Sequence, residues 1–230
     1  MSFAALPERL AQVRAEIARR QDAAGWTHPV TIVAVTKGFG ADAVVAALAG
    51  GLADIGENRV QEALDKMKDA AAPGARWHLI GHLQRNKAKL VPGRFALVHS
   101  VDSRDLAEEL SRRAKEPLRV LLQVNVAREP QKSGCTPEEA PALARQIAAF
   151  GGLQLDGLMT LAPLTDDVDV QRRTFRSLRA LRDTIKEEGL WLPTLSMGMS
   201  ADYGTAVEEG ATMIRLGTVL FGPREKETTP

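Results

Sequence analysis

The feature that most constrains the fold of this chain is a repeated alternation of short apolar runs with longer amphipathic stretches. The first run, residues 31–36 (TIVAVT), is rich in β-branched side chains, which is typical of a strand buried on both faces of a parallel sheet. Strands that alternate with helices predict β-α units. Seven further strand-like runs follow, at residues 53–56, 76–81, 95–101, 119–126, 153–162, 194–198 and 212–221.

Eight β-α units in about 200 residues predict an α/β fold, a (β/α)8 TIM barrel, with an extra helix before the first strand. Leu6, Leu10, Val13 and Ile17 fall at helical spacing and predict this N-terminal helix, which ends by Gly25. An open doubly wound sheet is the alternative, but it usually has fewer strands and a glycine-rich first turn. Neither a linker nor a low-complexity segment interrupts the series, so residues 1–230 are expected to form a single domain.

Composition narrows the class of partner. A net charge of +1 gives no field that would favour nucleic acid, and no apolar run approaches the roughly 20 residues that span a bilayer. The single cysteine, Cys135, excludes an intrachain disulfide and fits a reducing, cytoplasmic compartment. No base lies near Cys135 in the sequence, so a catalytic thiol is not expected. The partner is therefore expected to bind in a pocket.

Two segments near the C-terminus carry the groups that hold a phosphate. Residues 196–202 (SMGMSAD) and 214–218 (IRLGT) combine glycines and hydroxyls with a predicted helix start. The loops after strands seven and eight are where barrels most often bind phosphate, and Gly217 and Thr218 end the eighth strand. Ser200 is predicted to be the N-cap of the helix at 200–209, a role that is compatible with phosphate binding.

Two cations lie where a barrel would place its site. Lys37 directly follows the first strand, so it is predicted at the rim formed by the strand C-termini. A solvated lysine is the ordinary alternative, whereas a desolvated lysine forms Schiff bases with aldehydes. Arg215 lies inside an apolar strand and shares a face with Met213 and Gly217. A charge there needs a partner, so a salt bridge closing the barrel and a contact with a ligand both remain open.

A metal site is not predicted. His78 and His82 lie four residues apart, but on a strand this spacing separates their Cα atoms by roughly 13 Å, too far for one zinc ion. No acidic ligand lies adjacent to them in the sequence. The basic residues Arg85, Lys87 and Lys89 are predicted to form a solvated helix face, because no aromatic residues interleave them.

Five segments, taken together, resemble one known family. They are residues 32–37 (IVAVTK), 56–62 (GENRVQE), 77–87 (WHLIGHLQRNK), 195–200 (LSMGMS) and 214–218 (IRLGT). In this order they resemble the pyridoxal phosphate homeostasis protein family, also called the YggS or proline synthetase co-transcribed type. The resemblance covers nearly the whole chain and implies the barrel fold of the alanine racemase N-terminal domain.

The resemblance implies a cofactor and its contacts. Lys37 would hold pyridoxal 5′-phosphate as a Schiff base, an internal aldimine, and Arg215 would face the pyridine nitrogen. Ser200, Gly217 and Thr218 would bind the phosphate. The remaining implied neighbours of the cofactor are Asn58 beside the ring, His78, Ser196 and Met199. Residues 38–40 (GFG) depart from many relatives, which carry polar or proline residues there, so the flexibility and solvent cover of the lysine loop are open.

The implied function is a role in vitamin B6 homeostasis, in which the protein stores pyridoxal phosphate or delivers it to apo-enzymes. An arginine opposite the ring nitrogen makes the ring a poorer electron sink, which favours a carrier without catalytic residues. The alternative is a small amino-acid racemase, which needs a second acid/base. In alanine racemase that group comes from a further domain of the partner subunit, absent from a chain ending at Pro230. A monomer is therefore expected, and packing explains the single tyrosine, Tyr203.

Overall fold

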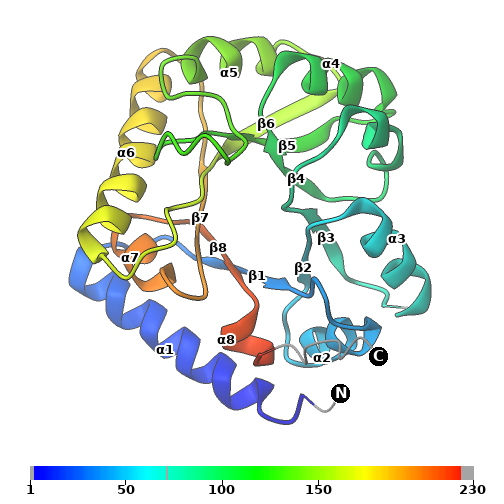
Figure 1. The fold of residues 1–230 in the computed structure, drawn as a ribbon, viewed down its shortest axis with the longest axis vertical. Coiled ribbons are helices and arrows are strands. Elements are labelled where there is room, and N and C mark those ends of the chain that lie inside the picture. Colours follow the sequence, from blue (N-terminus) through cyan, green and yellow to red (C-terminus); the bar gives the residue numbers. More distant parts are fainter. Residues whose placement is uncertain (1–2, 71, 224–230) are drawn as a thin grey trace.

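The structure is a computed structural model, described here for residues 3–70 and 72–223. Eight parallel strands pair in chain order and close into a barrel, with the last strand pairing with the first (Figure 1). The strands are β1 (Thr31–Val35), β2 (Asp54–Glu57), β3 (Arg76–Leu79), β4 (Leu97–Val101), β5 (Leu118–Gln123), β6 (Leu153–Met159), β7 (Thr194–Met199) and β8 (Met213–Leu216). The predicted (β/α)8 barrel is confirmed.

Helices surround the barrel on the outside (Figure 1). They are α1 (Leu6–Ala24), α2 (Ala41–Ala49), α3 (Val60–Asp69), the 3-10 helix η1 (Arg85–Leu90), α4 (Arg104–Arg113), α5 (Ala140–Ala148), α6 (Val168–Glu187), α7 (Tyr203–Glu208) and α8 (Thr218–Phe221). The extra N-terminal helix is confirmed as α1, whose C-cap Gly25 has a φ of 73°. The solvated basic face lies on the short 3-10 helix, where Arg85, Lys87 and Lys89 are exposed.

The predicted eighth strand was too long. The run 212–221 ends in three apolar residues, Val219, Leu220 and Phe221, but β8 ends at Leu216 and the chain continues as α8. A short apolar run has no periodicity that separates a buried strand from a buried helical turn. The consequence is that Gly217 and Thr218 lie at the start of a helix, where backbone N–H groups are available to an acceptor.

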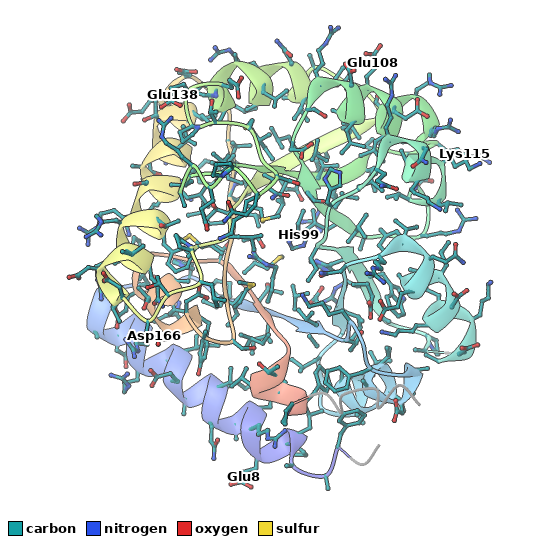
Figure 2. All side chains as sticks on the ribbon, viewed as in Figure 1. Glu8, His99, Glu108, Lys115, Glu138 and Asp166 are labelled. Carbon is teal, nitrogen blue, oxygen red and sulfur yellow. The ribbon has the colours of Figure 1, made fainter. Side chains whose placement is uncertain are left out.

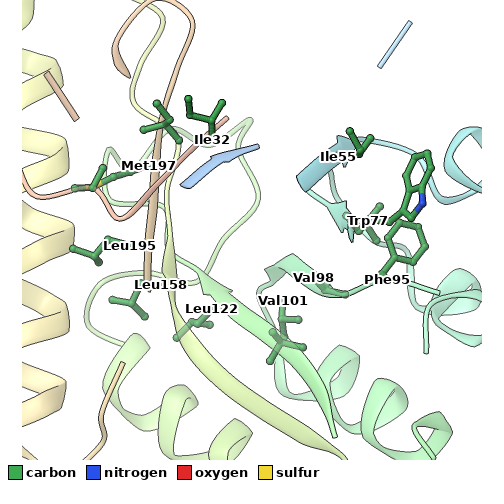
Figure 3. Packing of buried hydrophobic residues seen from close by; sticks show 14 of the residues in the cluster. Ile32, Ile55, Trp77, Phe95, Val98, Val101, Leu122, Leu158, Leu195 and Met197 are labelled. Carbon is green, nitrogen blue, oxygen red and sulfur yellow. The ribbon is translucent and has the colours of Figure 1, made fainter. Parts of the chain in front are cut away.

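Side chains along the strands alternate between the barrel interior and the layer between strands and helices. Five apolar side chains form a cluster inside the barrel: Val33, Leu97, Leu121, Met159 and Met213. Their neighbours along the strands belong to the larger cluster, and Figure 3 shows Leu195 and Met197 of β7 on the side of the strand that faces the helices. The rest of the barrel interior is left for polar groups.

Three phenylalanines pack together where the first and last units of the barrel meet. Phe39, which follows β1, packs against Phe3 and Phe221 with ring centroids 5.9 and 5.4 Å apart, and Phe3 and Phe221 lie 5.5 Å apart. Edge and tilted contacts of this kind are favourable beyond the area that they bury. Phe39 is only 6% exposed, so the loop at 38–40 is anchored to α8 by its central residue. This answers the question that the sequence left open about that loop.

Candidate functional site

A cavity of about 470 Å³ opens at the carboxyl ends of the strands. This is the end of the barrel where the β-α loops build binding sites. Seven of the nine predicted site residues line it: Lys37, Asn58, Met199, Ser200, Arg215, Gly217 and Thr218. The other lining residues are Val35, Ile80, Gly81, His82, Gln123, Gln131, Lys132, Ser133, Leu161 and Ala201. The topology therefore brings Lys37 and the residues predicted to bind phosphate to one cavity.

Lys37 stands on a backbone that is tied down on both sides. Lys66 of α3 donates to the carbonyl oxygen of Thr36 (2.7 Å) and to Glu57 Oε1 (2.6 Å). Thr36 Oγ1 also donates to Glu57 Oε1 (2.5 Å), and the backbone N–H of Gly38 donates to Glu62 Oε1 (2.7 Å). Lys66 donates to Glu62 as well (2.9 Å), so one connected set of ion pairs and hydrogen bonds fixes residues 36 and 38.

Glu57 accepts hydrogen bonds from two members of this set, Lys66 and Thr36. It is fully buried, and its second oxygen, Oε2, has no hydrogen-bond partner within the described residues. Burial raises the pKa of Glu57, against the hydrogen bonds from Lys66 and Thr36, which lower it. The sequence did not reveal that Lys66 would be buried, because a lysine on an amphipathic helix is usually solvated.

Ser200 binds the start of α8. Its Oγ accepts hydrogen bonds from the backbone N–H groups of Gly217 (3.2 Å) and Val219 (3.4 Å). The prediction that Ser200 caps the following helix was wrong, because α7 begins after Asp202, which makes no side-chain capping bond. The hydroxyl of Ser200 thus lies against the first amides of α8, and Ser200, Gly217 and Thr218 all line the cavity; hydroxyls and helix-start amides are groups that suit an anion.

The local backbone explains why Ser200 turns toward α8. Gly198 has a φ of 93° and redirects the chain as β7 ends. A Cβ at this position would lie 2.6 Å from Cβ of Ala206, closer than two carbon atoms approach, so only glycine fits. The pairing of β7 with β8 shifts register in the same stretch, between Ser196 and Met199. The serine therefore leaves the line of its strand.

Arg215 is buried at the bottom of the cavity with only neutral acceptors. Its guanidinium donates to Ser196 Oγ (2.7 Å) and to the carbonyl oxygen of Thr160 (2.9 Å), and the residue is 3% exposed. Burial lowers the pKa of Arg215 to about 10, with a small opposing effect of Asp202, so it stays charged at neutral pH. Within residues 3–70 and 72–223 it forms no salt bridge, so a barrel-closing ion pair is excluded there.

His78 and Ser196 lie behind the cavity wall and do not line the cavity itself. Both are buried inside the barrel, and His99, which the sequence analysis missed, lies between them. His99 Nε2 is 2.9 Å from His78 Nδ1, and His99 Nδ1 is 2.9 Å from Ser196 Oγ. Figure 2 shows His99 within the ring of strands. A polar residue in the middle of the apolar strand at 95–101 was the available signal.

The loop after β5 supplies further lining residues that the sequence analysis did not assign. Lys132 donates to the carbonyl oxygen of Ala162 (2.8 Å), and Gln123 donates to that of Ser133 (2.8 Å). A lysine in a loop after a barrel strand was the signal, since such loops meet at the carboxyl mouth. Cys135 of the same loop is buried, and burial raises the pKa of its thiol to about 12, so a reactive thiolate is not formed.

Two other predictions concern absences and alternatives. Among the described residues no group of three or more His, Cys, Asp or Glu side chains could hold a metal ion, and no helix is long and apolar enough to cross a membrane.

Tyr203 does not line the cavity and packs against the main hydrophobic cluster. Burial raises the pKa of its phenol, so the phenol keeps its proton at neutral pH.

The fold and the cavity together define a (β/α)8 barrel with a ligand site at the carboxyl ends of its strands. Residues 9–225 match the family described as alanine racemase, N-terminal domain. A pyridoxal phosphate homeostasis protein from Pseudomonas aeruginosa is 44% identical over 225 residues, 96% of each chain. This chain belongs to the pyridoxal phosphate homeostasis protein family.

Solved structures agree with this assignment. PipY of Synechococcus elongatus, a structure described as having PLP bound, is 38% identical and has a TM-score of 0.84 over 94% of this chain and all of that one. Alanine racemase from Clostridium difficile matches with a TM-score of 0.73 but only 14% identity, and 61% of that chain is covered. The second likeness shows the barrel fold alone.

Proposed function

We propose that this protein binds pyridoxal 5′-phosphate and takes part in vitamin B6 homeostasis by storing or delivering it. The observation that carries the proposal is the arrangement of three kinds of group around one cavity. An amine at Lys37, a charged guanidinium at Arg215 and a set of amide and hydroxyl donors at Ser200 and α8 line the same 470 Å³. A relative with 38% identity is described with PLP bound.

The residues fit the parts of this cofactor one by one. Lys37 is the attachment point, since the cofactor supplies an aldehyde that joins an amine. Ser200, Gly217 and Thr218 hold the phosphate, where a hydroxyl and backbone amides already converge. Arg215 faces the ring nitrogen, because its charge lacks a carboxylate among the described residues. Asn58 and Met199 flank the ring, while His78 and Ser196 support the site from inside the barrel.

Holding is favoured over turnover by the state of Arg215. Its pKa of about 10 keeps the guanidinium charged, and a cation at the ring nitrogen disfavours protonation of that nitrogen. The amino-acid racemase remains the alternative, and it requires a second acid/base in the cavity. Tyr203 lies outside the cavity and does not supply that group.

The proposal extends to partners and state. Recipients of the cofactor would be PLP-dependent apo-enzymes, and the protein would act as a cytoplasmic monomer formed by one domain over residues 1–230. The free, buried Cys135 fits a reducing compartment. The described residues include five large apolar side chains that are exposed. They are spread over α2, the β6–α6 connection, the start of α6, the α6–β7 connection and the end of β7.

The test is attachment of the cofactor to Lys37. Purified protein incubated with pyridoxal phosphate is expected to gain an absorbance band in the near-ultraviolet to visible range, and borohydride should fix the cofactor on the Lys37 peptide, as read by mass spectrometry. Lys37→Ala should lose both signals. Lys89→Ala, on the exposed face of η1, is the matched control and should keep both. A covalent adduct that persists in Lys37→Ala contradicts the assignment.

The racemase is tested separately. The loaded protein is incubated with each common amino acid in deuterium oxide, and α-proton exchange is followed by NMR against the free cofactor at the same concentration. Exchange no faster than that of free cofactor across the panel supports a carrier. Exchange well above that level for one amino acid would establish the racemase in its place.

A further inference from the structure

A continuous hydrogen-bonded chain crosses the barrel interior from its amino end to the cavity. Asp54 Oδ1 lies 3.0 Å from His78 Nε2, His78 Nδ1 lies 2.9 Å from His99 Nε2, and His99 Nδ1 lies 2.9 Å from Ser196 Oγ. Arg215 Nη1 then donates to the same Ser196 oxygen over 2.7 Å. The four residues from His78 to Arg215 are at most 3% exposed, and Asp54, at the amino end, is 8% exposed.

The two ends of this chain fix the direction of donation. Arg215 has only donors, so Ser196 Oγ accepts from it. Asp54 is ionised and only accepts: burial would raise its pKa, but hydrogen bonds from His78 and Arg76 lower it to about 2. His78 must therefore donate from Nε2. Burial lowers the pKa of His99 well below its usual range, and the charge of Arg215 acts in the same direction, so His99 is neutral and has one donor and one acceptor.

With one ring proton on each histidine, a single arrangement satisfies every contact. His78 Nδ1 accepts from His99 Nε2, which leaves His99 Nδ1 as an acceptor for the hydroxyl proton of Ser196. The lone pairs of Ser196 then face Arg215. The opposite tautomer of His99 would place an N–H against Ser196 and would need a proton from His78 Nδ1, leaving His78 without the N–H that Asp54 requires. In this arrangement every proton in the chain points from Arg215 toward Asp54.

We propose that His99 is a positioning residue, which orients the guanidinium of Arg215 toward the cofactor cavity by fixing the hydroxyl of Ser196. The role toward the cofactor rests on the proposed function; the order of protons in the chain does not. Without an acceptor at His99 Nδ1 the serine hydroxyl is free to rotate toward Arg215, and one of the two acceptors that hold the guanidinium is lost. Thr160 alone would leave the guanidinium free to turn.

An alternative explanation is that His78 and His99 are packing residues whose hydrogen bonds have no effect on the cavity. The barrel offers a matched control for packing. Leu97 lies two residues before His99 on β4, pairs with His78 in the sheet and belongs to the apolar cluster inside the barrel, and its side chain has no hydrogen-bonding atom. Leu97→Val perturbs the interior near His99 but removes no acceptor. An effect of packing alone would appear in both variants.

The first measurement is made on the protein without cofactor. Long-range proton–nitrogen correlation spectra at neutral pH distinguish the tautomers of histidine. Both His78 and His99 are expected to carry their proton on Nε2, with Nδ1 as the acceptor. An Nδ1–H proton on His99 would overturn the proposal, whether or not the protein binds pyridoxal phosphate. If the cofactor fails to bind at all, the proposed function fails while this measurement still decides the order of the chain.

The second measurement uses pyridoxal phosphate labelled with nitrogen-15 in its ring. His99→Leu is expected to weaken binding about tenfold, the effect of one charge-assisted hydrogen bond, and to move the resonance of the ring nitrogen. His99→Asn, in which Oδ1 provides an acceptor near the place of Nδ1, should restore both toward the native values, and Leu97→Val should leave the resonance unchanged. Equal effects of His99→Leu and Leu97→Val on the resonance would refute the role of His99.

Discussion

At the scale of single residues, the buried charges are the groups that set the geometry of the site. Lys66 and Glu57 are both buried and joined by an ion pair of 2.6 Å, and Lys66 also holds the backbone beside Lys37. Removing one partner of a buried ion pair leaves an uncompensated charge, which costs more than the pair contributes. The hydrogen bond that fixes the backbone beside Lys37 therefore depends on both members of the Lys66–Glu57 pair.

Lys66→Met is expected to lower the free energy of unfolding by about 3 kcal/mol at pH near 8, measured by urea denaturation. Burial already raises the pKa of Glu57, and loss of Lys66 raises it further. A carboxyl group whose pKa is raised in the folded state binds its proton more tightly there than in the unfolded state. The protonated group therefore contributes its full stabilisation below the usual pKa of 4.5, and this stabilisation is lost as pH rises through the folded-state pKa. The penalty should therefore shrink between about pH 8 and about pH 5.

Lys68→Met is the control, because Lys68 lies on the same helix with its side chain 74% exposed beside Asp65. Its effect should stay within about 0.5 kcal/mol at both pH values. Equal losses of stability in the two variants, or a penalty in Lys66→Met that does not change with pH, would contradict the role assigned to the buried pair.

At the scale of elements, the phosphate end of the cavity depends on a contact between two consecutive units of the barrel. Ser200, beyond β7, joins the first amides of α8. In Ser200→Ala the affinity for pyridoxal phosphate is expected to fall about tenfold, whereas the affinity for pyridoxal, which lacks the phosphate, should not change. Isothermal titration with both compounds measures the difference.

Ser103→Ala is a suitable control, since Ser103 is the N-cap of α4 and makes no side-chain capping bond. It should bind both compounds as the unmodified protein does. A parallel loss of affinity for pyridoxal and pyridoxal phosphate in Ser200→Ala would show that the serine supports the cavity generally and does not contact the phosphate.

The number and order of the strands were predictable from the sequence, because buried parallel strands are continuous apolar runs bounded by helical stretches. The lysine at the end of β1 and the glycine and hydroxyls after β7 and β8 followed from that count. The partner of Ser200 did not, since it depends on the turn at Gly198 and the helical start of α8. The link between His78 and His99 was also hidden, because it depends on the register in which β3 pairs with β4.

At the scale of the whole molecule, α1 is an integral part of the outer layer. Arg20 of α1 and Arg172 of α6 both pair with Glu208 of α7, so ion pairs join three helices across the outside of the barrel. Figure 1 shows α1 running beside α7 and α8. The helix thus covers the outer surface of the barrel at the junction of its last and first units.

The molecule is expected to be a monomer, because the exposed large apolar side chains of the described residues are distributed over several elements. Stable interfaces usually need a concentrated patch. Sedimentation equilibrium at micromolar concentration should give a mass near 24.9 kDa, with and without pyridoxal phosphate. A mass near twice this value would contradict the expectation and direct attention to the exposed Trp191 and Leu164.

The contact of Phe39 with Phe221 has a consequence for how the barrel opens. It fastens the loop after the first strand to the helix after the last one, and these two strands form the seam at which the ring of strands closes. A ligand attached at Lys37 and held at α8 would span the same seam from above. Such a ligand would stabilise the closure of the barrel in addition to the Phe39–Phe221 contact. The amide protons of β1 and β8 would then be the ones that it protects most from exchange with solvent.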